Sequence, residues 1–398
     1  MIARKRRILF VAEDTTLAQI VRLRVLADTL DPHRYEIHFA CQQFPDLIFS
    51  GSQFVRWPIY SLSPETVLTR AESGTSPYDI STLAKYVEAD LHLLDAVQPD
   101  LVVGDLRLSL AVSAEYKKIP FATLINAYWS RGWQPRPYPL PDHPTVRWFG
   151  TRIAGFFYPL ARPFVFRSFA APLNRLRKRY GLSTIGNLQD VLTYGTYTLY
   201  PDTPGLIPLP QMSSTERFLG PVLWSPALEL PTWWEHLRRD KPLIYLTLGS
   251  SGNHRVLPTV VDALADLPVE IAVSTAGKTS EHSLNAFTAP YLPGDKLCEH
   301  ADLVICNGGA TTAYQALYAG KPVIGIPSNL DQFLSAAAIQ GAGAGRWLRT
   351  SEVKDLKTVA AQLLEDSQAR KTAKQLRQEF LEFRSDFLFP KFVGSHFG

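Results

Sequence analysis

The sequence predicts an α/β protein made of two tandem Rossmann-like domains. Short apolar runs alternate with amphipathic stretches in two successive series along the 398 residues, a pattern typical of parallel sheets covered by helices. A segment with seven prolines, residues 201–231, separates the two series. A chain of this length is also too long for one compact core. We therefore expect two domains joined by a proline-rich linker.

The first series accounts for the N-terminal domain, predicted over residues 1–205. The run "RRILFVAE" is too short and too soon closed by acids to be a signal peptide, so it is interpreted as a buried strand. The stretch after it, "LAQIVRLRVLADTLDP", has apolar residues at helical spacing and ends at Asp31-Pro32. The later segments predict, in order, a strand, a helix, a strand, a helix and a strand: "YEIHFACQ", "STLAKYVEADLHLLDAVQ", "DLVVGD", "SLAVSAEYKKI" and "PFATLIN".

The second series predicts the C-terminal domain over residues 241–370, after a linker at 206–240. It contains the expected strands "PLIYLTLGS", "VEIAVSTAG", "ADLVICN" and "KPVIGIP", with the helices "RVLPTVVDALADL" and "TTAYQALYAG" among them. Residues 371–398 are predicted to form a C-terminal helix and an aromatic tail. Because strands and helices alternate, both sheets should be parallel and doubly wound.

Composition and charge narrow the class of protein. Three cysteines without a CxxC pair form neither a disulfide framework nor a zinc site, which indicates a reducing cytoplasm. Residues 131–180 carry ten Lys or Arg against one acid, although the whole chain has a net charge of only +4. Because the charge is local, a nucleic-acid partner is not predicted.

The basic segment is also aromatic. Residues 147–180 favour either peripheral contact with an anionic membrane or a lid with solvated arginines. Pro159, Pro163 and Pro172 are expected to divide the segment into short pieces. The sequence does not determine the oligomeric state.

A glycine turn in the second series has the order of a phosphate site. The strand "ADLVICN" runs into Gly308 and Gly309, and Thr311 and Thr312 stand at the start of the next helix. Glycines let the backbone approach a phosphate, and the free N–H groups of a helix start favour negative charge. A tight βα turn capped by Thr is the alternative interpretation.

Three further loops at the same predicted sheet edge favour a ligand. Asp331 and Gln332 follow "KPVIGIP" and are suited to sugar hydroxyls, because an acid beside an amide offers acceptors and donors. Ser250 and Ser251 follow the first strand of the domain, and "YLPGDKL" supplies a rigid Pro-Gly turn. In parallel sheets, ligands bind beyond the carboxyl ends of the strands.

The motif "NGGATTAYQALYAGKPVIGIPSNLDQ", residues 307–332, resembles nucleotide-sugar glycosyltransferases with the two-Rossmann (GT-B) architecture. The resemblance implies that the two domains face each other across a cleft and that the C-terminal helix packs back on the N-terminal domain. The group it resembles contains the glucuronosyltransferases and the bacterial natural-product and macrolide glycosyltransferases. The likeness is specific over about residues 220–350 and covers the N-terminal domain in rhythm only. It implies a donor site formed by Gly249, Ser250, Ser251, Leu292, Pro293, Asn307, Gly308, Gly309, Thr311, Thr312, Gln315, Asp331 and Gln332.

Within that set, the resemblance places the nucleobase on the loop of Leu292 and Pro293, the diphosphate on the serines, glycines and threonines, and the sugar on Asp331 and Gln332. No metal or other cofactor is implied, because N–H dipoles and hydroxyls can stabilise the leaving diphosphate. The sequence has no Asp-x-Asp pair, the ligand of metal-dependent relatives, and no Glu-x7-Glu, which is typical of retaining ones. Inversion is therefore expected.

The sequence departs from the family pattern at three positions. Asn307 replaces a His and Gln315 replaces a Glu, and both amides keep the capacity for hydrogen bonding. The third departure concerns the general base. The resemblance places Gln19 at the position of the catalytic His, and Gln cannot take a proton. Asp105 matches the family's supporting Asp, and Asp14 lies in the loop after the first strand.

Three interpretations of that departure stay open. Asp105 or Asp14 acts as the base with a pKa raised by burial; the acceptor is acidic enough, such as a phenol, to need little help; or the protein binds a nucleotide sugar without transferring it. A nucleotide-sugar epimerase is a further alternative. For either acid, helix capping is the structural interpretation.

The resemblance places the acceptor on the N-terminal domain, where aromatic residues follow the strand "PFATLIN". Tyr128, Trp129 and Trp133 are expected at the cleft, where aromatic side chains suit a flat or apolar acceptor. Simple packing of a long loop is the alternative for each of them. The sequence thus predicts a cytoplasmic, metal-independent, inverting hexosyltransferase that uses a UDP- or dTDP-sugar and a small apolar or aromatic acceptor, either a natural product or a lipid.

Overall fold

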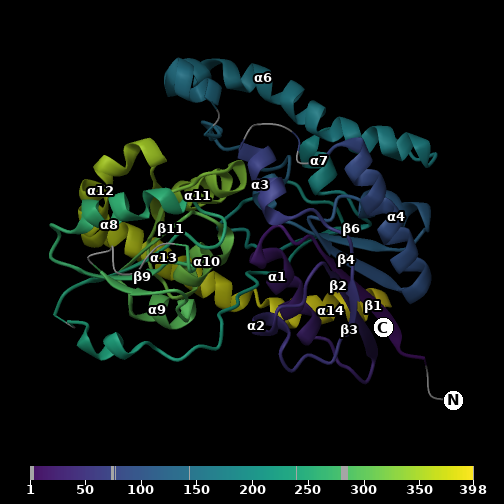
Figure 1. Cartoon of the computed structure of the whole chain (residues 1–398), viewed down its shortest axis with the longest axis horizontal. Helices are drawn as coiled ribbons and strands as arrows, with labels where there is room; N and C mark the ends of the chain where they lie inside the picture. Colours follow the sequence, from purple (N-terminus) through teal and green to yellow (C-terminus); the bar gives the residue numbers. More distant parts are fainter. Residues whose placement is uncertain are drawn as a thin grey trace.

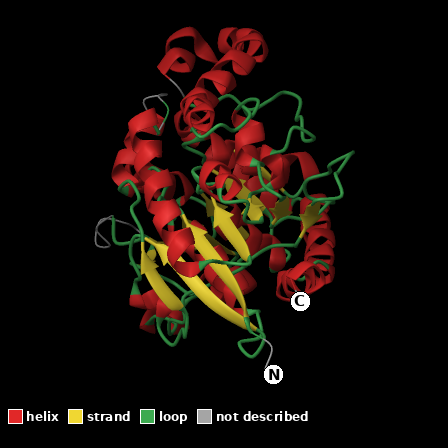
Figure 2. Ribbon diagram, turned by 90° about the vertical axis from the view of Figure 1, so that its right-hand side faces the viewer, coloured by secondary structure: helices red, strands yellow, loops and turns green. Residues whose placement is uncertain are grey.

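The computed structural model describes residues 4–72, 76, 78–142, 144–238, 240–278 and 286–397. It contains two α/β domains, each built on a parallel sheet with helices around it (Figures 1 and 2). The predicted fold class is confirmed. All eight strands predicted from the apolar runs are present, because buried strands of a parallel sheet are apolar over their whole length.

The N-terminal sheet has the strand order β3-β2-β1-β4-β5-β6-β7, and all of its pairings are parallel. Its strands are β1 (Arg6–Ala12), β2 (Tyr35–Cys41), β3 (Val55–Pro58), β4 (Leu101–Asp105), β5 (Phe121–Leu124), β6 (Tyr197–Tyr200) and β7 (Glu216–Phe218). Its helices are α1 (Leu17–Asp28), α2 (Asp46–Phe49), α3 (Pro64–Glu72), α4 (Ile80–Val97), α5 (Leu110–Tyr116), α6 (Pro144–Arg179) and α7 (Leu188–Leu192).

The C-terminal sheet has the equivalent order β10-β9-β8-β11-β12-β13. Its strands are β8 (Leu243–Thr247), β9 (Glu270–Ser274), β10 (Phe287–Ala289), β11 (Leu303–Cys306), β12 (Val323–Gly325) and β13 (Gly345–Trp347). Its helices are α8 (Leu257–Leu264), α9 (Gly294–His300), α10 (Ala310–Tyr318), α11 (Leu330–Ala342) and α12 (Leu356–Glu365), and α13 (Ser367–Glu382) and α14 (Ser385–Phe397) follow them.

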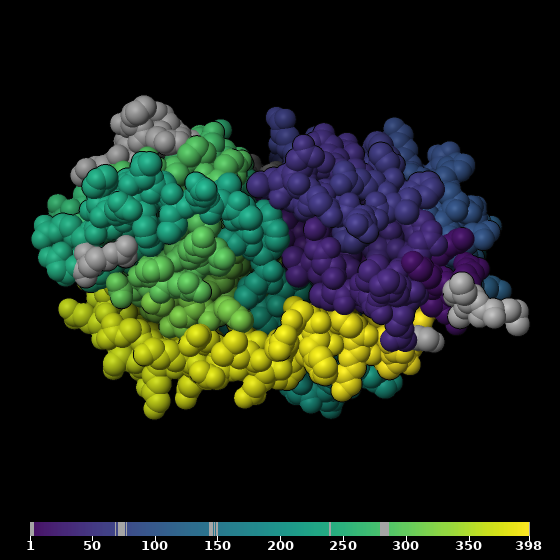
Figure 3. All heavy atoms as spheres, turned by 90° about the horizontal axis from the view of Figure 1, so that it is seen from below, coloured from purple at the N-terminus to yellow at the C-terminus, as the bar shows by residue number. Residues whose placement is uncertain are grey.

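The C-terminal end of the chain returns to the N-terminal domain. Phe389, Phe392 and Val393 of α14 are buried in the same apolar cluster as β1 and α1 of the N-terminal domain, as the sequence predicts. Figure 3 shows this C-terminal segment in yellow along one face of both domains. The N-terminal sheet also extends to β7, which lies inside the range predicted as linker. A three-residue edge strand carries too little pattern to be recognised in a sequence rich in proline.

Helix α6 differs from the prediction. The expectation that prolines divide this region into short pieces is wrong, because one helix contains Pro159, Pro163 and Pro172 and its break lies at Gly150, where φ is +76°. Pro159 and Pro163 are exposed, so water can bind the carbonyl groups that the missing N–H donors leave free. Among the described residues, no helix combines the length and apolar character needed to span a bilayer.

Candidate active site between the domains

The glycine turn after β11 has the geometry of an anion site. Gly308 has a φ of +76°, and a Cβ atom there would lie 3.0 Å from the Cβ atom of Ala336, so glycine is required. The Oδ1 atom of Asn307 accepts a hydrogen bond from the Gly309 N–H at 3.0 Å. Gly309 is the N-cap of α10 and makes no side-chain cap. The first-turn N–H groups of α10, at Ala310, Thr311 and Thr312, thus have no helical acceptor and can meet a phosphate.

Side-chain amides connect this turn to the neighbouring loops. Asn307 Nδ2 and Gln332 Nε2 both donate to Ser251 Oγ, at 3.4 and 3.2 Å. Gln332 Oε1 accepts from the N–H and the hydroxyl of Ser328, both at 2.9 Å. The predicted site residues from the ends of β8, β11 and β12 are therefore adjacent. Gly249 has a φ of +59° and precedes the serine loop, where a residue with a Cβ atom would be strained.

The remaining predicted donor residues have mixed environments. Leu292 is 4% exposed and packs in the apolar core, so its side chain supports the loop from within. Pro293 is buried at the N-cap of α9. Gln315 Nε2 donates to the carbonyl of Trp224 in the inter-domain segment. Thr311 and Thr312 are partly exposed at the start of α10.

Asp331 faces the N-terminal domain. Its Oδ1 atom accepts hydrogen bonds from the Tyr128 hydroxyl at 3.1 Å and from the Trp129 Nε1–H at 2.7 Å. Tyr128, Trp129 and Trp133 are all less than 9% exposed and belong to an apolar cluster shared with the C-terminal domain. The predicted donor and acceptor residues thus meet directly, and in this structure the aromatic loop is packed against Asp331.

Asp105 at the end of β4 is fully buried and ion-paired. Arg22 of α1 holds it with two hydrogen bonds, Nε to Oδ2 at 2.9 Å and Nη2 to Oδ1 at 2.8 Å. Burial raises the pKa of Asp105 to about 6, and Arg22 opposes that rise. At neutral pH the carboxylate is mainly ionised, with both oxygens engaged. In this arrangement it anchors Arg22.

The ion pair continues into a buried polar network that crosses between the domains. Arg22 Nη1 donates to Asn126 Oδ1 at 2.6 Å, and Asn126 Nδ2 donates to Asp202 Oδ1 at 2.9 Å. The hydroxyl of Tyr314, on α10, donates to the same Asp202 oxygen. Sequence reasoning missed Asp202. The only available signal was an acid between two prolines, in "YPDTPG", after the end of β6.

Gln19 caps helix α1. Its Oε1 atom accepts hydrogen bonds from the N–H groups of Thr15 at 3.1 Å and Thr16 at 3.0 Å. The side chain is buried, and the pattern is a capping box around the helix start. Gln19, the residue at the predicted catalytic position, therefore holds the loop that carries Asp14 through its side-chain oxygen.

A cavity of about 460 Å³ lies between the domains. Asp14 lines it from the N-terminal side, and Ser250 and Lys278 line it from the C-terminal side. Burial raises the pKa of Asp14, and the Gln43 N–H, which donates to Oδ2 at 3.2 Å, opposes that rise. The other lining residues are Thr15, Thr16, Leu17, Pro64, Glu65 and Thr69. Asp14 is thus the predicted acid that shares a cavity with a predicted donor residue.

Glu13 lies beside Asp14 but points into the domain. Its Oε1 atom accepts a hydrogen bond from the Tyr86 hydroxyl at 2.8 Å, and Arg107 is 3.6 Å from Oε2. Burial raises the pKa of Glu13 to about 7, while the charge of Arg107 opposes that rise. Arg107 also pairs with the buried Asp90 at 2.9 Å. This cluster supports the loop that carries Asp14.

Two Rossmann-like domains with a cavity between them, which the serine loop lines from the C-terminal side, define the class of GT-B glycosyltransferases. Residues 257–384 match the family model described as the C-terminal domain of erythromycin biosynthesis protein CIII-like proteins. Among solved structures, a calicheamicin glycosyltransferase aligns with a TM-score of 0.70 and 17% identity, covering 98% of each chain. A Streptomyces glycosyltransferase complexed with thymidine diphosphate aligns with a TM-score of 0.68 and 18% identity, covering 98% of this chain and 99% of the other.

Relatives from mycobacteria are much more similar in sequence. A PGL/p-HBAD biosynthesis glycosyltransferase of Mycobacterium tuberculosis is 46% identical over 95% of this chain and 90% of its own. A PGL/p-HBAD biosynthesis rhamnosyltransferase of Mycobacterium bovis is 46% identical over 97% of this chain and 86% of its own. The chain belongs to this family of glycosyltransferases. A further M. bovis relative, named as inactive, is 47% identical over 66% of this chain and 72% of its own.

Proposed function

We propose that this glycosyltransferase moves a hexose with inversion, and without a metal, from a nucleoside diphosphate to a hydroxyl of a small, largely apolar or phenolic acceptor. The observation that carries the proposal is the cavity between the domains, which has Asp14 on one side and the serine loop on the other. Such an arrangement presents a general base to the acceptor hydroxyl and hydrogen-bond donors to the diphosphate.

The names of the relatives refine the choice of substrates. One relative is named a rhamnosyltransferase, and one structural neighbour is complexed with thymidine diphosphate. These names favour a dTDP-sugar over a UDP-sugar, with rhamnose as the first sugar to test. They also favour an acceptor from PGL/p-HBAD biosynthesis, in keeping with the aromatic loop at Tyr128 and Trp129 beside Asp331.

In the proposed step, Asp14 is the base. Its carboxylate takes the proton of the acceptor hydroxyl while that oxygen forms a bond to the anomeric carbon. The bond from the anomeric carbon to the diphosphate oxygen breaks, and its electron pair leaves with the nucleoside diphosphate. The charge that develops there meets the first-turn N–H groups of α10 and the hydroxyls of Ser250 and Ser251. Asp105 is the weaker candidate, since Arg22 occupies both of its oxygens.

The test uses the full chain with dTDP- and UDP-hexoses and a phenolic acceptor, and it measures both the nucleoside diphosphate and the glycoside released. Asp14→Asn should lower kcat by about 100-fold or more and leave nucleotide affinity unchanged, because the carboxylate accepts the acceptor's proton in the transition state. Glu65→Gln is the matched control, since Glu65 lines the same cavity.

Two results would contradict parts of this proposal. A wild-type kcat in Asp14→Asn would remove Asp14 as the base. Nucleotide binding without any glycoside, over a panel of acceptors, would mean that this chain binds a nucleotide sugar without transferring it.

A further inference from the structure

Helix α6 presents a stripe of large apolar side chains to solvent. Ile153, Phe156, Phe157, Leu160 and Phe164 are between 53% and 74% exposed. Their spacing of three or four residues places them within about 100° of arc on one side of the helix. Isolated exposed apolar residues are common, but a continuous stripe on a single helix marks an interaction surface.

The opposite side of α6 fixes this orientation. Phe166 is 2% exposed and contacts the ring of Tyr138 edge-on. The guanidinium of Arg162 lies 4.0 Å from the centroid of the same ring, and its Nη2 atom donates to Gln134 Oε1 at 3.0 Å. Because the inner side is anchored by packing and hydrogen bonds, the apolar stripe cannot turn inward without breaking those contacts.

Positive charge accompanies the stripe. Residues 144–180 contain no Asp or Glu, and Arg152, Arg167 and Arg175 of α6 are exposed. Helical spacing places Arg167 and Arg175 within about 60° of the centre of the stripe. A helix with apolar side chains and cations on one side, and no acid of its own, is complementary to lipid headgroups that carry negative charge. Self-association of two copies through this side of α6 is disfavoured, because pairing would bring like charges together.

We propose that α6 docks this glycosyltransferase on the surface of an anionic lipid bilayer. The apolar stripe enters the boundary between headgroups and acyl chains, and Arg167 and Arg175 contact headgroup phosphates. The loop that carries Trp129 and Tyr138 directly precedes α6, so docking holds the acceptor side of the protein close to the bilayer. An apolar acceptor dissolved in the lipid can then reach the site over a short path.

Flotation of the full chain with lipid vesicles tests this proposal without any substrate. The wild type should float with vesicles of phosphatidylcholine and phosphatidylglycerol and much less with phosphatidylcholine alone. Phe156→Ser/Phe157→Ser should weaken partitioning by about 10-fold or more, since buried apolar area drives insertion. Arg167→Gln/Arg175→Gln should weaken it by about 30-fold on the anionic vesicles only.

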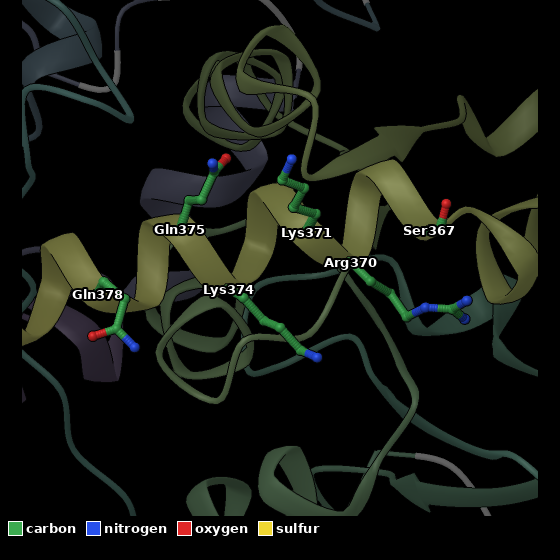
Figure 4. A pocket seen from close by; sticks show the side chains of 6 residues that line it. All are labelled: Ser367, Arg370, Lys371, Lys374, Gln375 and Gln378. Carbon is green, nitrogen blue, oxygen red and sulfur yellow. The ribbon is translucent and has the colours of Figure 1, made fainter.

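Matched controls are available elsewhere on the surface. Lys371 and Lys374 project from the exposed side of α13 (Figure 4), so Lys371→Gln/Lys374→Gln removes the same charge without touching α6. Phe387 of α14 is 61% exposed, and Phe387→Ser removes an exposed apolar side chain outside α6. Both controls should float as the wild type does, and all variants should keep the wild-type Tm because the changed side chains are exposed.

The proposal is overturned if the α6 variants float like the wild type, or if both controls lose binding equally. It is also overturned if sedimentation without lipid shows a wild-type dimer that Phe156→Ser/Phe157→Ser abolishes, because the stripe would then be a subunit interface. Equal binding to anionic and neutral vesicles would likewise overturn the proposal that the lipid surface is anionic.

Discussion

The proposed donor edge of the C-terminal domain, at Asn307, Gly308 and Gly309, and the facing edge of the N-terminal domain are built in different ways. At the donor edge, Asn307, Gly308 and Gly309 are neighbours in sequence and organise their own turn. At the N-terminal edge, Arg22 and Asp105 are 83 residues apart, and Asn126 and Asp202 are 76 apart. The donor edge is therefore a contiguous motif, whereas the N-terminal edge is a buried network assembled by the fold.

The difference explains where catalytic chemistry is easily misjudged. A contiguous motif keeps its geometry wherever its strand and helix form, so residue types indicate its function. In the network, Asp105 has the position of a functional acid, yet Arg22 engages both of its oxygens. Asp14, only partly buried, lines the cavity. The partner of a buried acid thus decides its role more than its location at a strand end does.

The largest expected effect comes from breaking the network at Arg22. Arg22→Met should lower the free energy of unfolding by about 3–5 kcal/mol, because it leaves the charge of Asp105 buried without its partner. Urea unfolding followed by circular dichroism measures this change. The double variant Arg22→Met/Asp105→Leu should recover much of the loss, and Arg238→Met, at an exposed ion pair, should change little. An Arg22→Met protein as stable as the wild type would mean that the network contributes nothing.

The next prediction concerns pH. Burial raises the pKa of Glu13 from 4.5 to about 7, so its contribution to stability is fully present below pH 4.5 and is lost as pH rises through 7. Relative to Glu13→Gln, the wild type should lose up to about 3 kcal/mol between pH 4.5 and 8. Urea unfolding at both pH values tests this. Parallel pH profiles in the two proteins would show that Glu13 has the same pKa in the folded and unfolded chains.

The third prediction concerns Asp331, which connects the two edges directly. Asp331→Ala should lower kcat/KM for the sugar donor by about 100-fold, because it removes the proposed ligand of the sugar hydroxyls and frees Tyr128 and Trp129. Steady-state kinetics with varied donor measures the loss. Trp129→Phe deletes one hydrogen bond to Asp331 and should have a smaller effect. If Trp129→Phe reproduces the full loss, Asp331 acts by holding the aromatic loop.

The smallest effect is expected at Gln19. Gln19→Ala should lower the free energy of unfolding by about 1 kcal/mol, since it removes a helix cap, and should change kcat only slightly. Gln19→Glu keeps the acceptor for Thr15 and Thr16 and should restore stability. A kcat loss in Gln19→Ala as large as that in Asp14→Asn would show that Gln19 takes a direct part in catalysis.

The sequence by itself determined the two parallel sheets, because fully buried strands appear as continuous apolar runs. It also indicated the proposed donor turn, because the turn needs a left-handed backbone at residue 308 that only glycine adopts easily. One of its failures concerns α6. Prolines at 159 and 163 predicted a broken helix, although their exposure makes them tolerable in α6.

Only the tertiary structure decided which charged groups meet. The Asp202 contacts with Asn126 and Tyr314 span 76 and 112 residues, and no local pattern encodes such a distance. The structure also decided which side of α6 is outward, with Phe166 buried and Phe164 exposed. The physical reason is the same in both cases. Backbone preferences and apolar periodicity act locally, whereas ion pairing and burial depend on the packing of distant segments.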